Sequence, residues 1–454
     1  MLVLGTAGAR WDSSINDNEI DFLIAKFFTY IRRNSTREKY SFNSFHATIG
    51  NFNITQPPGL NDDTDLASDI CIGFDARPQS AILARRMKIL LDITDSWESK
   101  SSLINNIPIT TPMLCRLCKS RKAFGIMFTA SHNPDNYVGV KFITPKGTLI
   151  DEKDVLSLNL NTRDYNVKMI DLASIYSSTV LPSYTKDKYS FSTLNGAAKG
   201  YINQIFKGQV IEDNTPAKNN SLEPKPDNII LPFETAQTGI AFALDGDGDR
   251  LLMFIDGEPL TPSETFLLFI KATSKKMLSK VIATYNMSNI IPKFCNEENI
   301  NFVWSKIGFQ HISPLYINSD DNVVAGEESG GLAFHPFFSD RDGIMAAIIL
   351  MNFNESRQGG LRSELQNIRE KYGRMRYSRF DIHTNMSIEE IKTKFENQVG
   401  KLGSPEQDVD GIKCPFMTGW IMFRKSGTEP LIRVYCEIPW NKKFNLEEAF
   451  NESY

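Results

Sequence analysis

Short apolar runs with turn residues at their ends alternate along the chain with longer segments of helical period. Residues 70–74 form such a run before the helical pattern of 80–91, and residues 125–129 form another before a turn that contains Pro134. Alternation of this kind is typical of mixed α/β chains with largely parallel sheets. The pattern therefore predicts repeated βα units.

The length and composition describe an ordinary globular chain with several cores. At 454 residues the chain is expected to form three or four domains of roughly 100–200 residues each. The hydrophobic content of 41% and the charged content of 23% are unremarkable for such a protein. Two polar stretches, 33–69 and 212–228, are predicted to be loops or insertions.

Net charge, cysteine positions and hydropathy limit the binding partners and the cellular compartment expected for this chain. The formal net charge of −4 argues against a nucleic-acid partner, although a small anionic substrate needs only local cations. The six cysteines follow no disulfide framework, and Cys115 and Cys118 are interpreted as small apolar residues on one helix face. No apolar run reaches ~18 residues and the N-terminus has no signal-peptide pattern, so we expect a cytoplasmic protein without a membrane partner.

The sharpest chemical signal is the acidic segment 244–250, which lies between two apolar runs. Asp245, Asp247 and Asp249 alternate with glycines that let the backbone curl, so their carboxylates can converge on one divalent cation. An EF-hand does not fit, because Arg250 and Asp256 occupy the positions that need Gly and Glu. A solvated acidic hairpin turn is the alternative. With three acidic ligands, a Mg²⁺ ion keeps a position open for a phosphate oxygen.

A second segment places a serine in a turn directly after a predicted strand, 124–128. Ser131 and His132 lie in residues 129–134, and Lys141 follows. Open α/β sheets bind their ligands at the carboxyl ends of strands, which makes Ser131 a candidate nucleophile. The alternative is that Ser131 only stabilises a turn and His132 is a surface imidazole.

A third segment, 326–331, combines Glu327, Glu328 and Ser329 with glycines. Carboxylates and a hydroxyl on a flexible loop can accept from and donate to sugar hydroxyls. A glycine-rich turn with solvated glutamates is the alternative.

A fourth segment, 424–430, brings cations, hydroxyls and a glycine together. Two hydroxyl side chains, exposed backbone N–H groups and flanking positive charge form a cradle for a dianion such as phosphate. A basic turn before a strand is the alternative. The residues expected to contribute are Arg424, Ser426, Gly427, Thr428 and the following Arg433.

In this order, the four segments resemble the α-D-phosphohexomutase superfamily, which contains phosphoglucomutases, phosphomannomutases and phosphoglucosamine mutases. The resemblance covers most of the chain. Further similar segments are 5–10, 73–80, Thr111–Pro112, 195–198 and 341–344. Val138 departs from the pattern, because the family usually has Asn there.

The resemblance implies an α/β fold with four domains around a central cleft. Three domains are of related α/β build and the fourth is a smaller α+β domain that acts as a lid. The implied bounds are 1–152 with the phosphoserine, 153–256 with the metal loop, 257–370 with the sugar loop and 371–454 with the phosphate loop.

The resemblance also implies roles for individual residues. Ser131 carries a phosphoryl group and, with Asp245, Asp247 and Asp249, holds one Mg²⁺ per chain. Lys141 is the general acid/base, and a base role requires its pKa to fall towards neutral through burial and cationic neighbours. The other implied residues are His132 and Arg10 beside the phosphoserine, Glu327 and Ser329 for sugar hydroxyls, and Arg250, Arg424, Ser426, Gly427, Thr428 and Arg433 for the substrate.

The implied reaction interconverts hexose 1-phosphate and hexose 6-phosphate, with hexose 1,6-bisphosphate as activator and intermediate. The loop at Glu327 favours glucose and mannose phosphates, while a phosphoglucosamine or phosphoacetylglucosamine mutase is the alternative. A weakly catalytic sugar-phosphate-binding scaffold and a phosphoserine phosphatase are alternatives from other classes. The expected partner is a small sugar phosphate, and the chain is expected to be a monomer or homodimer.

Overall fold

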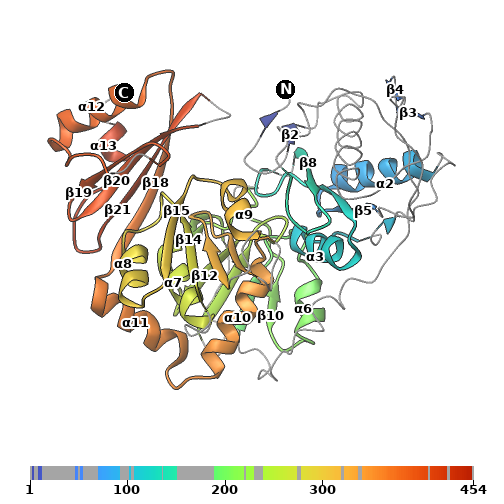
Figure 1. Ribbon diagram of the computed structural model, residues 1–454, viewed down its shortest axis with the longest axis horizontal. Coiled ribbons are helices and arrows are strands. Elements are labelled where there is room, and N and C mark those ends of the chain that lie inside the picture. Colours follow the sequence, from blue (N-terminus) through green and yellow to red (C-terminus); the bar gives the residue numbers. More distant parts are fainter. Residues whose placement is uncertain are drawn as a thin grey trace. The chain divides into compact units, whose positions relative to one another are not determined.

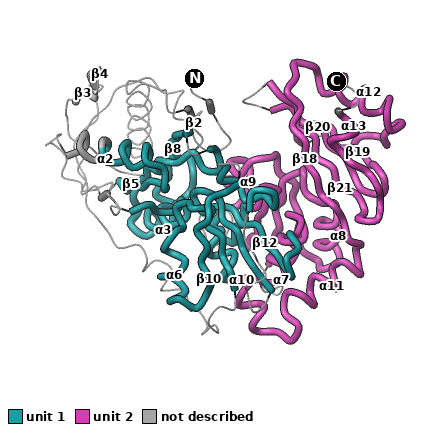
Figure 2. The backbone as a smooth tube through the Cα atoms, turned by 180° about the vertical axis from the view of Figure 1, so that it is seen from behind, with its two compact units in different colours: residues 1–259, 331–348 teal, residues 260–330, 349–454 magenta. Residues whose placement is uncertain are grey.

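The computed structural model divides the chain into two compact units (Figure 2), residues 1–259 with 331–348, and residues 260–330 with 349–454. The structure describes residues 3–4, 9–12, 47–49, 52–54, 70–92, 102–103, 107–134, 136–150, 189–218, 221–229, 239–273, 278–317, 322–335, 340–406, 409–426 and 430–451. Of the expected site residues, Gly427 and Thr428 lie outside this described part, as does the side chain of Arg10.

The first unit contains a six-stranded mixed sheet with helices α2 (Pro78–Asp92) and α3 (Thr111–Arg121). The strand order is β1 (Val3–Leu4), β2 (Ala9–Asp12), β8 (Tyr137–Ile143), β7 (Phe124–Phe128), β5 (Ile70–Phe74) and β6 (Ser102–Leu103). Strands β5, β6 and β7 are parallel, whereas β8, β2 and β1 pair antiparallel. The expected largely parallel sheet is thus only half parallel, because a short turn joins β7 directly to β8.

Local sequence explains why α3 begins and ends where it does. The Thr110 hydroxyl accepts a hydrogen bond from the Met113 N–H at 3.3 Å, and proline occupies the first turn. The helix ends at Lys122, whose φ of 53° is left-handed. Cys115 and Cys118 are buried on this helix, as the sequence predicts.

A second sheet in the first unit carries the acidic segment. Its order is β10 (Ile211–Asp213), β9 (Tyr189–Ser192), β11 (Ile240–Leu244), β12 (Leu251–Ile255) and β13 (Glu258–Pro259). The antiparallel pairing of β11 with β12 makes the acidic segment the loop of a hairpin. Both strands are apolar and largely buried, which fixes the base of that loop. The described part of this unit also contains helix α6 (Tyr201–Ile205), the 3-10 helix η2 (Pro226–Asn228), strand β17 (Leu332–His335) and the hairpin of β3 (Ala47–Ile49) and β4 (Phe52–Ile54).

The second unit begins with parallel strands and helices. Strand β14 (Lys280–Thr284) lies between β15 (Asn301–Ser305) and β16 (Val323–Gly326), parallel to both. The helices are α7 (Pro262–Ala272), α8 (Ile290–Glu297), α9 (Phe309–Ile317) and α11 (Gly360–Tyr372), and α10 (Gly343–Glu355) begins in the first unit and ends in the second.

A four-stranded antiparallel sheet follows in the same unit (Figure 1). Its order is β18 (Met375–His383), β21 (Leu431–Pro439), β20 (Gly419–Lys425) and β19 (Ile412–Phe416). One face packs against α12 (Ile388–Val399) and α13 (Glu448–Asn451) around Phe395 and Phe450. The other face places Trp420, Met422 and Tyr435 against Tyr285. The mixed α/β, multidomain fold class is confirmed, while the four domain bounds stay predictions.

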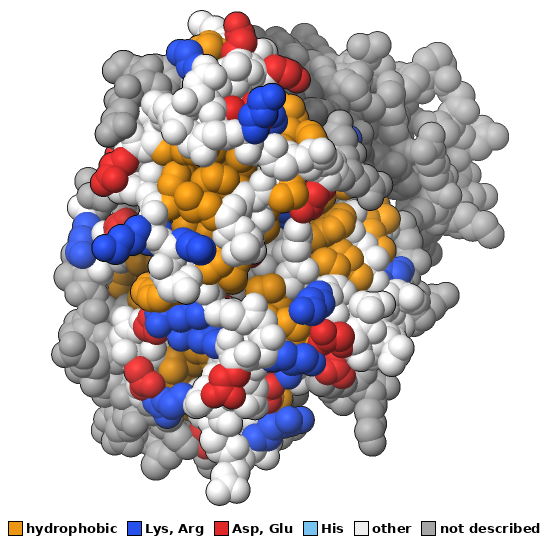
Figure 3. Space-filling view, turned by 90° about the vertical axis from the view of Figure 1, so that its left-hand side faces the viewer, with side chains coloured by type: hydrophobic (Ala, Val, Ile, Leu, Met, Phe, Trp, Pro, Cys, Tyr) orange, Lys and Arg blue, Asp and Glu red, His pale blue; other side chains and the backbone are white. Residues whose placement is uncertain are grey.

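The surface drawn in Figure 3 carries both signs of charge. Lys and Arg side chains lie close to Asp and Glu side chains across the lower half of that face, with hydrophobic side chains between them. In the part of the chain that the structure describes, no helix has the length and apolar character needed to cross a membrane.

Candidate active site

The turn after β7 presents Ser131 from a constrained backbone. Ser131 has a φ of 56° and is only 1% exposed. A left-handed φ is uncommon for a residue with a side chain and is found where surrounding contacts enforce it. The Ser131 hydroxyl donates to Asp245 Oδ2 at 3.2 Å, so the turn meets the acidic loop.

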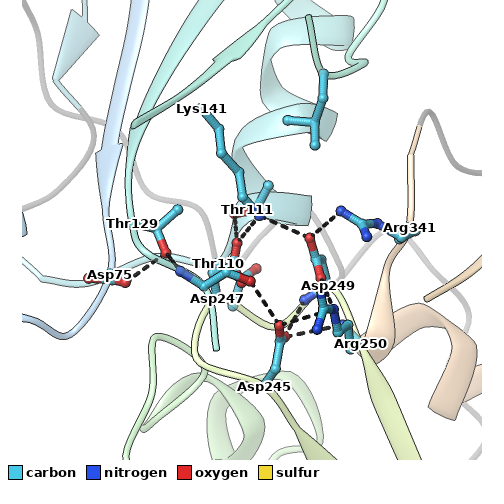
Figure 4. Close-up of polar contacts among 12 residues, drawn as sticks. Asp75, Thr110, Thr111, Thr129, Lys141, Asp245, Asp247, Asp249, Arg250 and Arg341 are labelled. Atoms are coloured by element: carbon cyan, nitrogen blue, oxygen red, sulfur yellow. Dashed lines mark hydrogen bonds and ion pairs between the residues drawn. The ribbon is translucent and has the colours of Figure 1, made fainter. Parts of the chain in front are cut away.

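Three polar side chains hold this serine turn in place. Thr129 Oγ1 accepts from the Ser131 N–H at 2.8 Å and donates to Asp75 Oδ2 at 2.7 Å (Figure 4). Arg77, paired with Asp75, donates to the carbonyl oxygens of Ser131 and Asn133 at 2.9 and 2.6 Å. Buried charge-assisted hydrogen bonds of this kind are strong, and they fix the backbone that carries the serine side chain.

The acidic loop approaches Ser131 closely because a glycine occupies the contact point. A Cβ on Gly246 would collide with the Ser131 carbonyl oxygen. Asp245 Oδ1 accepts from the N–H groups of Asp249 and Arg250 at 3.0 and 3.2 Å, which closes the loop on itself. The alternative interpretation of the sequence, in which this segment is a solvated acidic hairpin turn, is wrong, because all three aspartates are at most 1% exposed.

The three aspartates suit a metal ion. One carboxylate oxygen from each lies within 4.8 Å of the other two. Asp247 Oδ1 and Asp249 Oδ1 are buried and have no hydrogen-bond partner, so two lone-pair-bearing oxygens remain available. Burial and the charges of Asp249 and Asp247 raise the pKa of Asp245 well above its usual value. A cation among these oxygens would relieve that repulsion, and oxygen ligands of this type are those that Mg²⁺ prefers.

Lys141, on β8 three residues after Val138, points into the same cluster. Its Nζ donates to Asp247 Oδ2 at 2.5 Å and to Asp249 Oδ2 at 3.0 Å. Burial alone would lower the pKa of Lys141, but these two carboxylates outweigh burial and raise it. The expected fall in pKa is therefore wrong for this arrangement, because the closest charged neighbours are anions. The same ammonium outweighs burial at Asp247 and holds the pKa of that carboxyl below its usual value.

Arginines enclose the aspartates from two segments of the first unit. Arg250 Nε lies 3.8 Å from Asp245 Oδ2 and 3.7 Å from Asp249 Oδ1. Arg341 donates to Asp249 Oδ2 at 2.8 Å, and Thr111 donates its hydroxyl to Asp247 (Figure 4). The segments of Arg341 and Thr111 belong to the sequence resemblance, but sequence reasoning gave neither residue a role.

Of the other two residues predicted beside the serine, one lies on β2 and the other in the serine turn. Arg10 is on β2, where it pairs in register with Gly139 of β8. His132 follows Ser131 in the turn, and its carbonyl oxygen accepts from the Ser221 hydroxyl at 3.3 Å.

The second unit contains the residues predicted to bind the sugar hydroxyls and the nonreacting phosphate, as far as the structure describes them. Ser329 donates to Glu327 Oε1 at 2.7 Å in the loop after β16. Arg424 and Arg433 are directly paired on β20 and β21, so their side chains share one face of the sheet. The backbone N–H of Ser426, one of the predicted phosphate ligands, donates to the Leu431 carbonyl oxygen at 2.9 Å.

Comparisons with known proteins agree with this arrangement. Phosphoglucomutase/phosphomannomutase alpha/beta/alpha domain I matches residues 60–163, and domain III of the same family matches residues 261–372. A phosphoglucosamine mutase of Limosilactobacillus reuteri subsp. reuteri is 27% identical over 72% of this chain and 77% of its own length. A phosphoglucomutase/phosphomannomutase of Thermococcus kodakarensis is 27% identical over 70% of this chain and 75% of its own length.

Solved structures show the same fold. Parafusin, a phosphoglucomutase from Paramecium, superposes with a TM-score of 0.71 at 18% identity, covering 99% of this chain and 93% of the other. A phosphoglucomutase/phosphomannomutase family protein from Burkholderia thailandensis gives a TM-score of 0.70 at 16% identity, covering 99% and 97%. The chain belongs to the α-D-phosphohexomutase superfamily and is an isomerase of the phosphoglucomutase/phosphomannomutase type.

Proposed function

We propose that this chain interconverts hexose 1-phosphate and hexose 6-phosphate through a phosphoserine at Ser131 and a bisphosphorylated sugar. The observation that carries the proposal is the 3.2 Å contact between Ser131 Oγ and Asp245 Oδ2, inside a buried cluster that also contains Lys141. Phosphoryl transfer depends mainly on positioning and charge stabilisation, and this cluster supplies both.

Asp245, Asp247 and Asp249 would hold one Mg²⁺, together with an oxygen on Ser131. When bound, such an ion would supply positive charge that stabilises the transferring phosphoryl group and favours the neutral form of the neighbouring lysine.

Side chains of the protein itself have the remaining roles in the reaction. Thr129 and Arg77 hold the backbone of Ser131 through its N–H and its carbonyl oxygen. We assign Lys141 as the base: in its neutral form its Nζ, which lies within 3.0 Å of Asp247 and Asp249, would accept the proton of the sugar hydroxyl that attacks the Ser131 phosphate. Arg250 and Arg341 keep positive charge beside the carboxylates and the reacting phosphate.

In the second unit, we assign Glu327 and Ser329 to the sugar hydroxyls. Arg424, Ser426 and Arg433, with Gly427 and Thr428, bind the phosphate that does not react. The paired Arg424 and Arg433 supply the planar donor groups that phosphate recognition favours.

We assign glucose and mannose phosphates as the substrates, because the loop Glu327–Glu328–Ser329 offers carboxylate acceptors for neutral sugar hydroxyls. Glucosamine phosphate is the second candidate, since several similar relatives are phosphoglucosamine mutases. The two glutamates also suit an ammonium group, so this candidate has a physical basis in the same loop.

A substrate panel tests the proposal. The 1-phosphates of glucose, mannose, glucosamine and N-acetylglucosamine are each supplied with Mg²⁺ and a trace of the matching 1,6-bisphosphate, and the 6-phosphate is measured. We expect turnover of the glucose and mannose compounds to exceed that of the amino sugars. Release of inorganic phosphate would indicate a phosphatase, and no turnover of any compound would indicate a sugar-phosphate-binding scaffold.

A further inference from the structure

Asp410 connects a predicted phosphate ligand to a distant loop of the same unit. Its Oδ2 accepts from Arg424 Nε at 2.9 Å and from the Ile307 N–H at 2.8 Å. Arg424 is on β20, whereas Ile307 lies between β15 and α9. One carboxylate oxygen therefore fixes an arginine of the antiparallel sheet against the backbone of the loop that follows β15.

The backbone around Asp410 is shaped to deliver this carboxylate. Gly411 has a φ of 108°, and a Cβ there would come 2.5 Å from the Phe423 carbonyl oxygen. Only glycine adopts this conformation and this close approach without strain. Val409 and Ile307 both pack against the aromatic cluster of Tyr285 and Trp420. The residues before and after Asp410, Val409 and Gly411, thus hold its backbone in place.

The contact limits how Arg424 can move. An arginine anchored through Nε cannot rotate its guanidinium freely, so the two terminal nitrogens keep one plane for a bidentate contact with phosphate. The Arg424 side chain is 13% exposed and that of Asp410 is 21% exposed, so solvent screens the pair only partly.

The neighbouring arginine has a carboxylate partner of its own. Arg433 Nε lies 3.6 Å from Asp381 Oδ2, and Arg379 donates to both oxygens of Asp381 at 3.0 and 2.8 Å. Two arginines side by side repel each other, and an acid beside each one counters that repulsion. Asp410 differs from Asp381 because its second hydrogen bond goes to a backbone N–H outside the sheet.

We propose that Asp410 is a positioning residue that orients Arg424 for the nonreacting phosphate of the sugar substrate. The inference rests on the proposed function, since it takes Arg424 as a phosphate ligand. Binding of that phosphate is the same before and during phosphoryl transfer, so its loss raises KM and leaves kcat nearly unchanged.

Replacing Asp410 by a neutral residue distinguishes a positioning role for this side chain from a purely electrostatic one. If Asp410 only placed a negative charge near the phosphate, Asp410→Asn would strengthen the attraction and lower KM. Positioning predicts the opposite sign, a KM about tenfold higher with kcat changed less than about twofold. Asp410→Glu keeps the charge but displaces the oxygen, so its KM should fall between those of the wild type and Asp410→Asn.

The experiment measures kcat and KM of the full chain for its best substrate from the panel. The variants are Asp410→Asn, Asp410→Glu, Arg424→Ala and the double variant Asp410→Asn/Arg424→Ala. The matched control is Glu406→Gln, which loses a carboxylate that accepts from Asn289 Nδ2 at 2.8 Å but does not contact Arg424 in the described structure. We expect an unchanged KM in the control and no further rise in KM when Asp410→Asn is added to Arg424→Ala.

An equal or lower KM in Asp410→Asn would overturn the inference, as would an undiminished tenfold effect in the Arg424→Ala background. Calorimetric binding of glucose 1-phosphate separates this failure from failure of the proposed function, because it needs no turnover. A wild type that binds but does not turn over refutes the mutase, and the inference then stands only if Asp410→Asn weakens binding about tenfold. A wild type that neither binds nor turns over the compound refutes both.

Discussion

Glu437 is a buried carboxylate whose ionisation opposes folding of the second unit. It lies on β21 and is 2% exposed, and its Oε1 accepts from the Ser288 hydroxyl at 2.5 Å and from Trp420 Nε1 at 3.2 Å. Burial raises the pKa of Glu437 to about 7, although Ser288 and the ammonium of Lys413 partly oppose this. We predict that Glu437→Gln removes a pH dependence of stability.

The magnitude follows from the pKa. A rise from 4.5 to about 7 corresponds to about 3 kcal/mol, at about 1.4 kcal/mol per pH unit. The folded state binds the proton more tightly than the unfolded chain, so the contribution of Glu437 to the free energy of unfolding falls by about 3 kcal/mol as pH rises from about 4.5 to about 7. Burial lowers the pKa of Lys413 to about 8, so its titration adds little to this change below pH 7.

Urea unfolding followed by tryptophan fluorescence measures this effect, since the Trp420 indole bonds to Glu437. The difference in unfolding free energy between Glu437→Gln and the wild type should grow by about 3 kcal/mol between pH 4.5 and pH 7.5. The control is Glu447→Gln, which removes an exposed carboxylate near the same sheet and should leave the slope unchanged. Parallel pH curves for the wild type and Glu437→Gln would refute the reasoning.

Three further predictions concern the active site and the terminal sheet. Ser131→Ala should abolish both the phosphoryl adduct in the intact-mass spectrum and the mutase activity, and full activity would rule out Ser131 as the phosphate carrier. Asp247→Asn should lower kcat by about 100-fold or more and weaken the dependence on Mg²⁺, whereas an unchanged Mg²⁺ titration would contradict the metal site. Gly419→Ala should destabilise the protein by about 2 kcal/mol in urea unfolding, because the new Cβ collides with the Glu437 carbonyl oxygen. A variant that unfolds at the same urea concentration as the wild type would show that the two strands move apart without a loss of stability.

The geometry of the candidate nucleophile and metal ligands could be predicted from sequence because their signals are local. The alternation of Asp245, Asp247 and Asp249 with glycine specifies a curled loop within a few residues, and the structure shows that loop as a buried hairpin end. Ser131 follows a five-residue apolar strand, as the sequence predicts. Its left-handed backbone conformation explains how the turn places Ser131 against the acidic loop. In both segments, the spacing along the chain determines the geometry.

The charges around these groups could not be assigned in the same way. The pKa of Lys141 rises, against expectation, because its neighbours come from a loop about a hundred residues away, and no local pattern gives their sign. Arg341 reaches Asp249 across 92 residues, and Arg424 meets Asp410 across 14. Each of these contacts depends on strand order and register, which single-sequence patterns do not specify.

The residues that sequence reasoning missed have a common design. Thr129 bonds to the Ser131 N–H and to Asp75, and Asp410 bonds to the Ile307 N–H and to Arg424. Each fixes a backbone amide and a side chain together: Thr129 restrains the backbone of Ser131, and Asp410 restricts the rotamers of Arg424 before substrate binds. Binding then loses less side-chain entropy, at about 0.5–1.5 kcal/mol for each immobilised side chain. Changes at such anchors should therefore appear in KM or in stability, while changes at Ser131 appear in kcat, and this division distinguishes an anchor from a reacting group in kinetics alone.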